Sequence, residues 1–545
     1  MTIGEKIIHL RVTSNISQDE LAKKLGVSRQ ALSKWEKDET QPQIDSVKQL
    51  CELFKISADE LIDDKIVIHR GKKLKMSIGE DIKTKYFGTD GFRGEANKVL
   101  NCDHAYKIGR FLGWFYANPE FCDVKPGYRP RVVIGKDTRR SSYMFEYAVA
   151  AGLAASGADV DLLHVTTTPS VSFIVRQDGF DCGVMITASH NPFFDNGIKV
   201  INSSGEKLED EVAFLAEAYI DGNLEKLGVK DGDLPFAEKE NIGTINDYSS
   251  GRNRYIGYLI SLATHSMKTL RIGLDTANGA SWMIAKSVFD ALGAQTVIIN
   301  NNPDGLNINV NAGSTHIENL CKFVKDNKLD VGFAFDGDAD RCIAVDENGR
   351  EVDGDKIMYL LALKLKAEGA LDGDTLVTTI MSNSGLTKAL KAKGIANVQT
   401  KVGDRFVFEK MQKDGYSLGG EQSGHVIIKK YATTGDGVLT AIMVVEQMLN
   451  CKEPLSKLVA PVKLLPQKLK NVRVTNKAAV VDDEQVKAKF EEVNKEIGDN
   501  GRALLRQSGT EPVVRIMLEC PTLEECDKYI EKIYNVIKKR GYVCE

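Results

Sequence analysis

Three short apolar segments, each ending in a polar or glycine-containing turn and each followed by a helix-like segment, constrain the fold more than any other feature. They lie at residues 131–134, 271–274 and 375–380. An apolar strand followed by an amphipathic helix is the building unit of α/β proteins. Because this unit recurs at widely separated positions, the sequence predicts three similar α/β domains rather than one sheet.

The chain after residue 465 follows a different pattern. A strand at 472–474, a helix at 482–497, a hairpin-like stretch at 503–518 and a last helix at 523–539 predict a small α+β domain. A segment rich in Lys, Gly and Ser reads as a linker. The expected boundaries are 1–65 for an N-terminal domain, 66–82 for the linker, 83–245, 246–345 and 346–460 for the α/β domains, and 461–545 for the α+β domain.

Residues 1–65 are expected to form a separate all-α domain. Ser17, followed three residues later by Glu20, predicts the start of a helix, and Gly26 predicts its end. Ser28 then caps a second helix. Helix, short glycine turn and helix make up the helix-turn-helix arrangement, with residues 28–37 as the recognition helix.

Within this module, Leu32 and Trp35 are predicted to face inward, and a later helix is predicted to pack through Val47, Leu50 and Leu53. Residues 18–35 closely resemble the Cro/phage-repressor family of DNA-binding domains, and the similarity covers roughly residues 3–62. The resemblance implies duplex DNA as a partner, bound by a homodimer that holds two recognition helices roughly 34 Å apart. A helical bundle with solvated charges is the alternative. The residues expected to contact DNA are Gln18, Ser28, Arg29, Gln30, Ser33 and Lys34.

Composition excludes several classes of protein. The net charge of −4 argues against a wholesale nucleic-acid or membrane binder, and no apolar run is long enough to span a membrane. The N-terminus carries Glu5 and Lys6 and lacks an apolar signal core. Ten cysteines without Cys-x-x-Cys spacing indicate free thiols in a reducing compartment. We therefore expect a cytoplasmic protein.

A serine lies where a buried strand is predicted to end. The apolar segment 182–186 leads into the sequence TASHNP at 187–192. Proline at 192 disfavours helix for the residue before it, so a turn is expected here. Ser189 is then a hydroxyl at a strand edge with His190 beside it. Taken alone, these residue types are equally typical of an ordinary turn.

A second apolar segment, 331–335, leads into DGDADR at 336–341. Carboxylates on alternate residues of an extended loop project to one side, and the three here suit Mg²⁺ or Mn²⁺: Asp336, Asp338 and Asp340. An EF-hand calcium loop is the competing interpretation, since Glu347 falls at its twelfth position. That loop needs flanking helices and glycine at the sixth position, where this chain has Arg341. Residues 342–345 continue as a strand, so the sequence predicts a magnesium or manganese site.

Two further polar stretches suit a phosphorylated sugar. Residues 506–512 read RQSGTEP and, with Arg515, offer guanidinium and hydroxyl donors that fit a phosphate. Residues 420–425 read GEQSGH and mix donors and acceptors that fit vicinal sugar hydroxyls. A serine hydroxyl beside a metal site can carry a phosphoryl group, because positioning and charge neutralisation drive that chemistry. Together, these stretches predict an enzyme acting on a phosphosugar.

These motifs, with KYFGTDGFRG at 85–94, occur in one order over some 460 residues and resemble the phosphohexomutase superfamily. Residues 303–309 and 313–316 resemble its glucosamine branch rather than phosphomannomutases. The resemblance implies four domains around a central cleft. It also implies a mechanism in which phosphoserine donates to one end of a hexosamine phosphate and is rephosphorylated from the other end of the bisphosphate intermediate.

The resemblance assigns roles to individual residues. Ser189 carries the phosphoryl group, with Arg93, Lys199 and His190 assisting, and Mg²⁺ is bound by Ser189, Asp336, Asp338 and Asp340. The residues expected to bind substrate are Arg341, Glu421, Ser423, His425, Arg506, Ser508, Gly509, Thr510 and Arg515.

The expected activity interconverts glucosamine 6-phosphate and glucosamine 1-phosphate, with a hexosamine bisphosphate or another phosphoryl donor priming Ser189. Two alternatives remain. One is a phosphomannomutase or phosphoglucomutase, and the other is a transcription regulator that senses sugar phosphates through a mutase region that has lost its catalytic activity.

Overall fold

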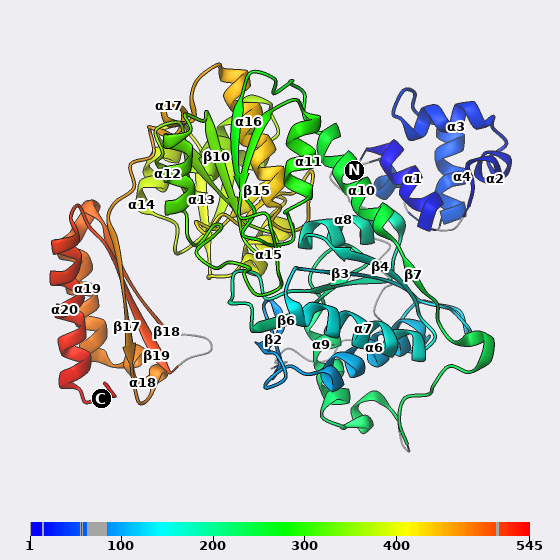
Figure 1. Cartoon of the computed structure of the whole chain (residues 1–545), viewed down its shortest axis with the longest axis horizontal. Coiled ribbons are helices and arrows are strands. Elements are labelled where there is room, and N and C mark those ends of the chain that lie inside the picture. Colours follow the sequence, from blue (N-terminus) through cyan, green and yellow to red (C-terminus); the bar gives the residue numbers. More distant parts are fainter. Residues whose placement is uncertain are drawn as a thin grey trace.

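The computed structural model describes residues 2–13, 16–54, 56, 58–62, 84–229, 232–507 and 512–544. The predicted linker at 66–82 lies outside these residues, as do Ser508, Gly509 and Thr510 of the predicted phosphate-binding loop. The described part folds into a helical N-terminal domain, three α/β units and a C-terminal α+β unit (Figure 1).

The first unit is built on a seven-stranded sheet in the order β1-β2-β6-β5-β3-β4-β7. Apolar side chains on α6, α7 and α9 cover one face of this sheet, and those on α8 and α10 cover the other. Its elements are β1 (Phe87–Gly88), β2 (Gly91–Glu95), α6 (Cys102–Ala117), β3 (Arg131–Lys136), α7 (Arg140–Ala155), β4 (Asp159–Val165), α8 (Thr168–Asp178), β5 (Cys182–Ile186), β6 (Asp195–Asn202), α9 (Asp210–Ile220), β7 (Ile245–Asp247) and α10 (Ser249–Ser261).

The second unit has a five-stranded sheet in the order β12-β11-β10-β8-β9, and the third has a four-stranded sheet in the order β14-β13-β15-β16. The elements of the second unit are β8 (Arg271–Asp275), α11 (Ile284–Ala291), β9 (Gln295–Ile299), α12 (Glu318–Asp326), β10 (Val331–Phe335), β11 (Cys342–Asp346) and β12 (Glu351–Val352). Those of the third are α13 (Gly354–Ala367), β13 (Thr375–Thr379), α14 (Ser384–Lys391), β14 (Ala396–Thr400), α15 (Asp404–Asp414), β15 (Leu418–Gly420), β16 (Val426–Ile428), α16 (Gly437–Cys451) and α17 (Leu455–Val459).

The three units share one strand arrangement. In each, three parallel strands are followed by an antiparallel one: β4-β3-β5 then β6, β9-β8-β10 then β11, and β14-β13-β15 then β16. The prediction of three similar α/β units is therefore confirmed.

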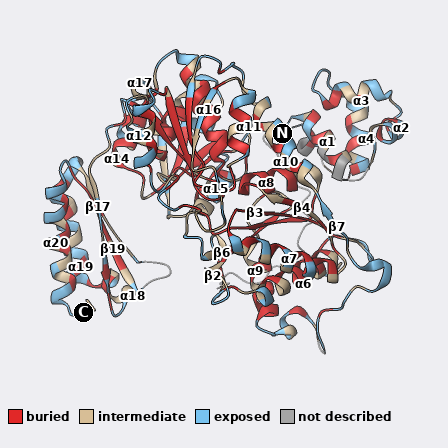
Figure 2. Cartoon of the chain, in the orientation of Figure 1, coloured by how far each residue is buried: buried red, intermediate tan, exposed pale blue. Residues whose placement is uncertain are grey.

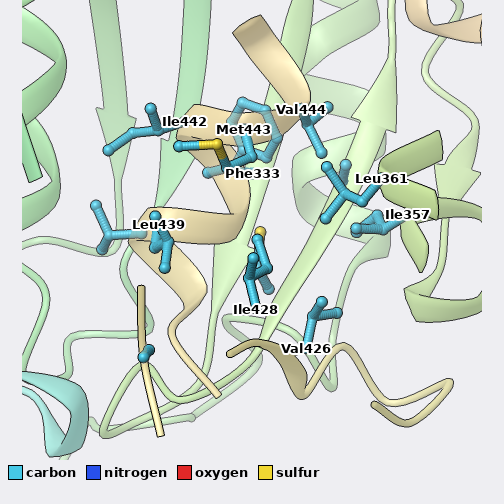
Figure 3. Close-up of a cluster of buried hydrophobic side chains, with 14 of the residues drawn as sticks. Phe333, Ile357, Leu361, Val426, Ile428, Leu439, Ile442, Met443 and Val444 are labelled. Carbon is cyan, nitrogen blue, oxygen red and sulfur yellow. The ribbon is translucent and has the colours of Figure 1, made fainter. Parts of the chain in front are cut away.

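One continuous apolar cluster joins the three units. It contains Met185 from the first sheet, Phe333 from the second and Leu418 from the third. Figure 3 shows side chains of β10, α13, β16 and α16 meeting in this cluster. The strands and inward helix faces are buried, while the outer helix faces are exposed (Figure 2). The first three units are thus packed against one another rather than strung along a linker.

The C-terminal unit has a three-stranded antiparallel sheet covered by helices, as the sequence predicted, with two differences. The first strand begins at Gln467, earlier than the predicted 472–474. Its leading residues are mostly polar and exposed, so they give no apolar strand signal in the sequence. The predicted helix 482–497 is two helices, because the Asp483 carboxylate accepts from the backbone N–H groups of Gln485 and Val486 and starts a new helix there. Its elements are β17 (Gln467–Arg473), α18 (Lys477–Asp482), α19 (Glu484–Ile497), β18 (Arg502–Gln507), β19 (Val513–Glu519) and α20 (Leu523–Lys539).

The N-terminal domain has its own apolar core. Ser17 and Ser28 each accept a backbone N–H from the residue three positions on, so both predicted caps are confirmed. One prediction is wrong: Leu53 is 36% exposed, and Phe54 is buried instead. Helical spacing from Val47 and Leu50 brings position 54, not 53, onto the inward face. Its helices are α1 (Ile3–Thr13), α2 (Gln18–Lys24), α3 (Arg29–Glu36), α4 (Ile44–Phe54) and α5 (Ala58–Ile62).

Two composition-based expectations can be compared with the structure. None of the ten cysteines, all of which lie among the described residues, forms a disulfide, as predicted. Among the described residues, no helix combines the length and the apolar character that crossing a membrane requires.

Candidate active site

Three of the predicted motifs occupy the same position in the three α/β units. The serine loop connects β5 to β6, the aspartate loop connects β10 to β11, and the GEQSGH loop connects β15 to β16. Each therefore lies where the last parallel strand ends and the sheet turns antiparallel. Ligand sites of α/β sheets form at the carboxyl ends of parallel strands, so this placement favours a shared site.

Ser189 lies in the interior where the first two loops meet. Its side chain is 1% exposed, and Oγ donates to Asp336 Oδ2 at 2.6 Å. His190 Nδ1 is 3.3 Å from the same hydroxyl. Burial, together with Arg341 and Arg93, lowers the pKa of His190 to about 4, so this imidazole is neutral at pH 7. The structure thus brings together Ser189, His190 and the first of the predicted metal ligands.

Side chains from the first and second units hold the backbone of the serine loop. The Ser189 carbonyl accepts from Arg139 Nη2 and from Asn309 Nδ2, each at 2.8 Å. Asp137, which binds the Arg139 guanidinium, also accepts from Thr187 Oγ1 at 2.8 Å, and Thr187 in turn accepts the Ser189 N–H at 2.9 Å. These bonds fix the direction of the Ser189 side chain.

The three aspartates of the second loop form a buried acidic cluster. One carboxylate oxygen from each of Asp336, Asp338 and Asp340 lies within 4.8 Å of the others. Lys199 Nζ is 2.7 Å from Asp338 Oδ2 and 3.3 Å from Asp340 Oδ2, and Thr168 Oγ1 donates to Asp338 at 2.5 Å. The other oxygens of Asp338 and Asp340 are buried and accept no hydrogen bond from the residues that the structure describes. Orphaned carboxylate oxygens in a buried cluster fit a divalent cation.

Electrostatics support the same reading. Burial, with Asp340 and Asp338 nearby, raises the pKa of Asp336 well above its usual range. Burial also acts to raise the pKa of Asp340, but Lys199 and His425 outweigh it and hold that pKa well below the usual range. Burial opposes the charge on Lys199, yet Asp338 and Asp340 raise its pKa. The pKa of Asp336 stays raised although Arg341 lowers it, so a cation there would relieve the repulsion that remains between the carboxylates.

Of the other predicted catalytic residues, Arg93 lies on β2, next to the site. Its guanidinium is 3.6 Å from Asp90, and its positive charge acts on His190. Arg341 follows the aspartates, and its backbone N–H donates to Asp336 at 3.2 Å.

The GEQSGH loop packs on the aspartate loop. Cys342 N–H donates to the Gly424 carbonyl at 3.0 Å. Glu421 and Ser423 are half-buried, and Glu421 Oε1 accepts the Gly403 N–H at 3.0 Å. His425 is buried, whereas Glu421 and Ser423, also predicted to bind the sugar, are only half-buried.

Two partners compete for one nitrogen of His425. Its Nε2 is 3.3 Å from Asp404 Oδ2 and 3.0 Å from the Gly435 N–H, and a protonated Nε2 serves only the first. Burial opposes the charged ring, but Asp404 and Asp340 raise the pKa of His425 to about 9. The charged ring, paired with Asp404 and Asp340, is therefore the form at pH 7.

A cavity opens where the first three units meet. Its wall includes Thr168 and Lys199 of the first unit, Asp340 of the second, and Asp404 and Arg405 of the third. It is therefore adjacent to the aspartate cluster.

The predicted phosphate-binding arginines lie in the C-terminal unit. Arg506 on β18 and Arg515 on β19 are directly opposite in the antiparallel register. This hairpin stands apart from β10 and the aspartate loop in Figure 1. The unit contacts the third one where Arg502 donates to the Ser382 carbonyl and Ser384 N–H donates to Glu519. The structure does not bring Arg506 and Arg515 to Ser189.

Several residues that contact the site were not predicted from the sequence. Arg139 and Thr168 lie in no predicted motif, and Asn309 ends the 303–309 stretch without a predicted role at the serine; each contacts a residue distant in the chain. Arg139 follows a predicted strand at 131–134, so its place at the carboxyl end of that strand was an available signal. Nothing in the sequence indicates the contacts of Thr168 and Asn309.

The predicted DNA-contacting residues lie on the second and third helices. Ser28, Arg29, Gln30 and Lys34 are exposed, and Ser33 is half-buried. Arg29 is 3.6 Å from Asp19. Gln18 has a structural contact as well, because its amide donates to the buried Glu36 at 2.5 Å.

Comparison with known families agrees with this architecture. Four regions match the phosphoglucomutase/phosphomannomutase family: alpha/beta/alpha domain I at 84–226, domain II at 253–349, domain III at 353–464 and the C-terminal domain at 469–536. Residues 7–61 match a helix-turn-helix family. The chain belongs to the phosphoglucomutase/phosphomannomutase family, the phosphohexomutases.

Two curated relatives within that family are phosphoglucosamine mutases. That of Lachnospira eligens is 57% identical over 458 residues, covering 84% of this chain and 99% of the relative. That of Bacillus subtilis is 47% identical over 454 residues, covering 83% and 98%. The helix-turn-helix match at 7–61 lies outside the four phosphohexomutase domains.

Solved structures confirm the fold. A phosphoglucomutase/phosphomannomutase family protein of Burkholderia thailandensis superposes with a TM-score of 0.68 at 24% identity, over 84% of this chain and 98% of the other. An N-acetylphosphoglucosamine mutase of Aspergillus fumigatus, solved with GlcNAc-6P and magnesium, gives 0.60 at 17% identity, over 84% and 96%.

Proposed function

We propose that the protein interconverts glucosamine 6-phosphate and glucosamine 1-phosphate through a phosphorylated Ser189. The observation that carries this proposal is the buried Ser189 hydroxyl, 2.6 Å from Asp336, beside two further aspartates and Lys199. The phosphoglucosamine mutase relatives support glucosamine phosphate as substrate. A retired enzyme could lose the serine or an aspartate, and this chain retains all four.

In the forward reaction, a sugar hydroxyl oxygen attacks the phosphorus of phosphoserine and the P–Oγ bond breaks. Lys199, 2.7 Å from Asp338, offsets the charge that gathers around Ser189 during transfer. The bisphosphate then reorients, and Ser189 Oγ attacks the phosphorus at the other end. We assign the sugar hydroxyls to Glu421, Ser423 and His425, and the distal phosphate to Arg506, Arg515 and the loop between them.

Mg²⁺ is the cation we assign to Asp336, Asp338 and Asp340, where it would supply positive charge to the transferring phosphoryl oxygens. Arg93 and His190 flank the serine and would assist proton transfer or charge balance. A hexosamine bisphosphate is the proposed priming donor, since it can leave one phosphoryl on Ser189 and depart as the monophosphate. Ten cysteines without a disulfide among the described residues support a reducing, cytoplasmic location.

The test is turnover by the purified protein, followed by phosphorus NMR. Glucosamine 6-phosphate with catalytic glucosamine bisphosphate should yield the 1-phosphate, with kcat/KM well above that for mannose or glucose phosphates. Comparable efficiency on mannose 1-phosphate would move the protein to the phosphomannomutase branch. A folded protein that turns over no hexose phosphate would support the sensor interpretation instead.

We also propose that the N-terminal domain binds duplex DNA as a homodimer. The supporting observation is the exposed face of α3, which presents Arg29, Gln30 and Lys34. Lys34→Ala should weaken binding to all sequences and flatten the salt dependence by about one unit of slope, whereas Gln30→Ala should relax selectivity. Selection from a random duplex library that enriches no motif at physiological salt would contradict this proposal.

A further inference from the structure

The first and third α/β units are tied together by polar side chains on two segments. One is the connection from β6 to the start of α9, and the other is helix α15. Arg405 Nη1 and Nη2 donate to the two carboxylate oxygens of Asp210 at 2.5 and 2.8 Å, a bidentate pair. Gln412 Nε2 donates to Glu206 Oε1 at 2.6 Å. Figure 1 shows α15 at the junction of the two units.

A lysine between these contacts adds a second tie. Lys207 Nζ is 2.7 Å from Asp404 Oδ1 on α15 and 3.2 Å from Asp90 Oδ1 near β2. Nearby, Thr433 Oγ1 donates to the Gly205 carbonyl at 2.7 Å. We name the first-to-third clamp as Glu206, Lys207, Asp210, Asp404, Arg405 and Gln412.

Both ends of the clamp reach the candidate active site. Helix α15 begins directly after Gly403, whose N–H donates to Glu421 Oε1, and Asp404 lies 3.3 Å from His425. The other segment continues from β6, whose Lys199 contacts Asp338 and Asp340. The clamp therefore spans the distance between the serine-bearing unit and the GEQSGH loop.

We infer that the Asp210–Arg405 pair positions the GEQSGH loop for the mutase reaction, an inference that rests on the proposed function. Both side chains are partly exposed, at 44% and 30%. Exposed ion pairs contribute little to folding stability. A displacement of about 1 Å at the reacting groups, in contrast, can cost roughly 100-fold in rate. The pair therefore matters for geometry rather than for stability.

The test compares Asp210→Arg, Arg405→Asp and the double variant that exchanges the two charges. Each single variant should lower kcat/KM about tenfold and raise KM, because the sugar-binding loop is displaced while its residues remain. The double variant should recover most of the activity, because the reversed pair again joins a cation on one unit to a carboxylate on the other. A loss through unfolding alone would reduce the active fraction without moving KM.

A matched pair serves as control. Lys468 and Asp527 are 2.6 Å apart and similarly exposed, at 45% and 54%, but lie within the C-terminal unit. Lys468→Asp and Asp527→Lys should leave KM unchanged. Hydrogen exchange of the full chain should show faster exchange at 203–213 and 403–409 in the two clamp variants only.

The outcomes separate the two proposals. Single clamp variants with wild-type KM, or no recovery in the double variant, would overturn the positioning role. Unchanged hydrogen exchange at both segments would overturn the clamp itself. A wild-type protein that turns over neither glucosamine phosphate would instead overturn the proposed function. Hydrogen exchange at 203–213 and 403–409 would still test whether the clamp joins the two units.

Discussion

Ser189 adopts a backbone conformation that side chains rarely take, with φ of +52°. Ala339 in the facing loop does the same, at +55°. Such residues cost about 1–3 kcal/mol each and persist where surrounding contacts over-determine them. Here Arg139 and Asn309 grip the Ser189 carbonyl and supply those contacts. The strained residue is the one we propose as phosphoryl carrier.

Ser189→Ala should abolish turnover and leave the fold intact, because alanine retains Cβ and loses only the hydroxyl that would be phosphorylated. Intact-mass measurement should show the wild type partly carrying one phosphate that this variant lacks. Ser203→Ala, in the turn after β6, is the matched control and should retain both phosphate and activity. Near-wild-type turnover by Ser189→Ala would refute the mechanism.

Thr168 tests the metal assignment from outside the aspartate cluster. Its hydroxyl donates to Asp338 Oδ2 at 2.5 Å, and valine has the same shape without the donor. Partners of metal ligands typically contribute about 10–100-fold in affinity, so Thr168→Val should raise the Mg²⁺ concentration for half-maximal activity by that range. Calorimetry of Mg²⁺ binding checks it without turnover. Thr168→Ser, which keeps the hydroxyl, should bind as the wild type does.

At the scale of elements, three loops at equivalent sheet positions build one site. Residues 182–186 and 331–335 were predicted as strands that lead into the loops carrying Ser189 and Asp336. The bounds of both strands are confirmed. Local sequence is sufficient there, because the apolar run and the polar turn are adjacent. The contacts between the loops were not predictable, since Thr168 and Asp338 or Asn309 and Ser189 meet only after three units pack together. The contacts of the clamp could not be predicted from the sequence either, because its two segments meet only after the units pack together.

Gly337 sets how closely the serine and aspartate loops approach. A Cβ there would lie 2.4 Å from the Ser189 carbonyl oxygen, a backbone atom that cannot rotate away. Gly337→Ala should therefore destabilise the protein by about 1–3 kcal/mol and lower turnover. Thermal unfolding and the mutase assay measure the two effects.

Gly257 offers the control for that substitution. It lies on α10, and a Cβ there meets nothing within 4 Å. Gly257→Ala should stabilise the helix by about 0.5–1 kcal/mol with activity unchanged. A Gly337→Ala protein as stable and active as the wild type would show that the two loops can separate without cost.

At the scale of the molecule, the helix-turn-helix domain is an addition to a complete phosphohexomutase. Its core is separate, and its match at residues 7–61 lies outside the four phosphohexomutase domains, the first of which begins at residue 84. Removing residues 1–65 should therefore leave kcat/KM on glucosamine phosphates unchanged and abolish DNA binding. A mobility-shift assay beside the mutase assay measures both. Loss of turnover in the shortened chain would show that catalysis needs the N-terminal domain.

The hydrogen bond from Ser189 to Asp336 has a thermodynamic consequence. Phosphorylation replaces that donor with a dianion facing three carboxylates, so the phosphorylated state is destabilised unless a cation binds there. Cation binding and phosphorylation must then favour each other by the same factor, because linkage is reciprocal. A chelator should accordingly shift the resting population toward the unphosphorylated form, and the stock of primed enzyme in a cell would follow its free Mg²⁺.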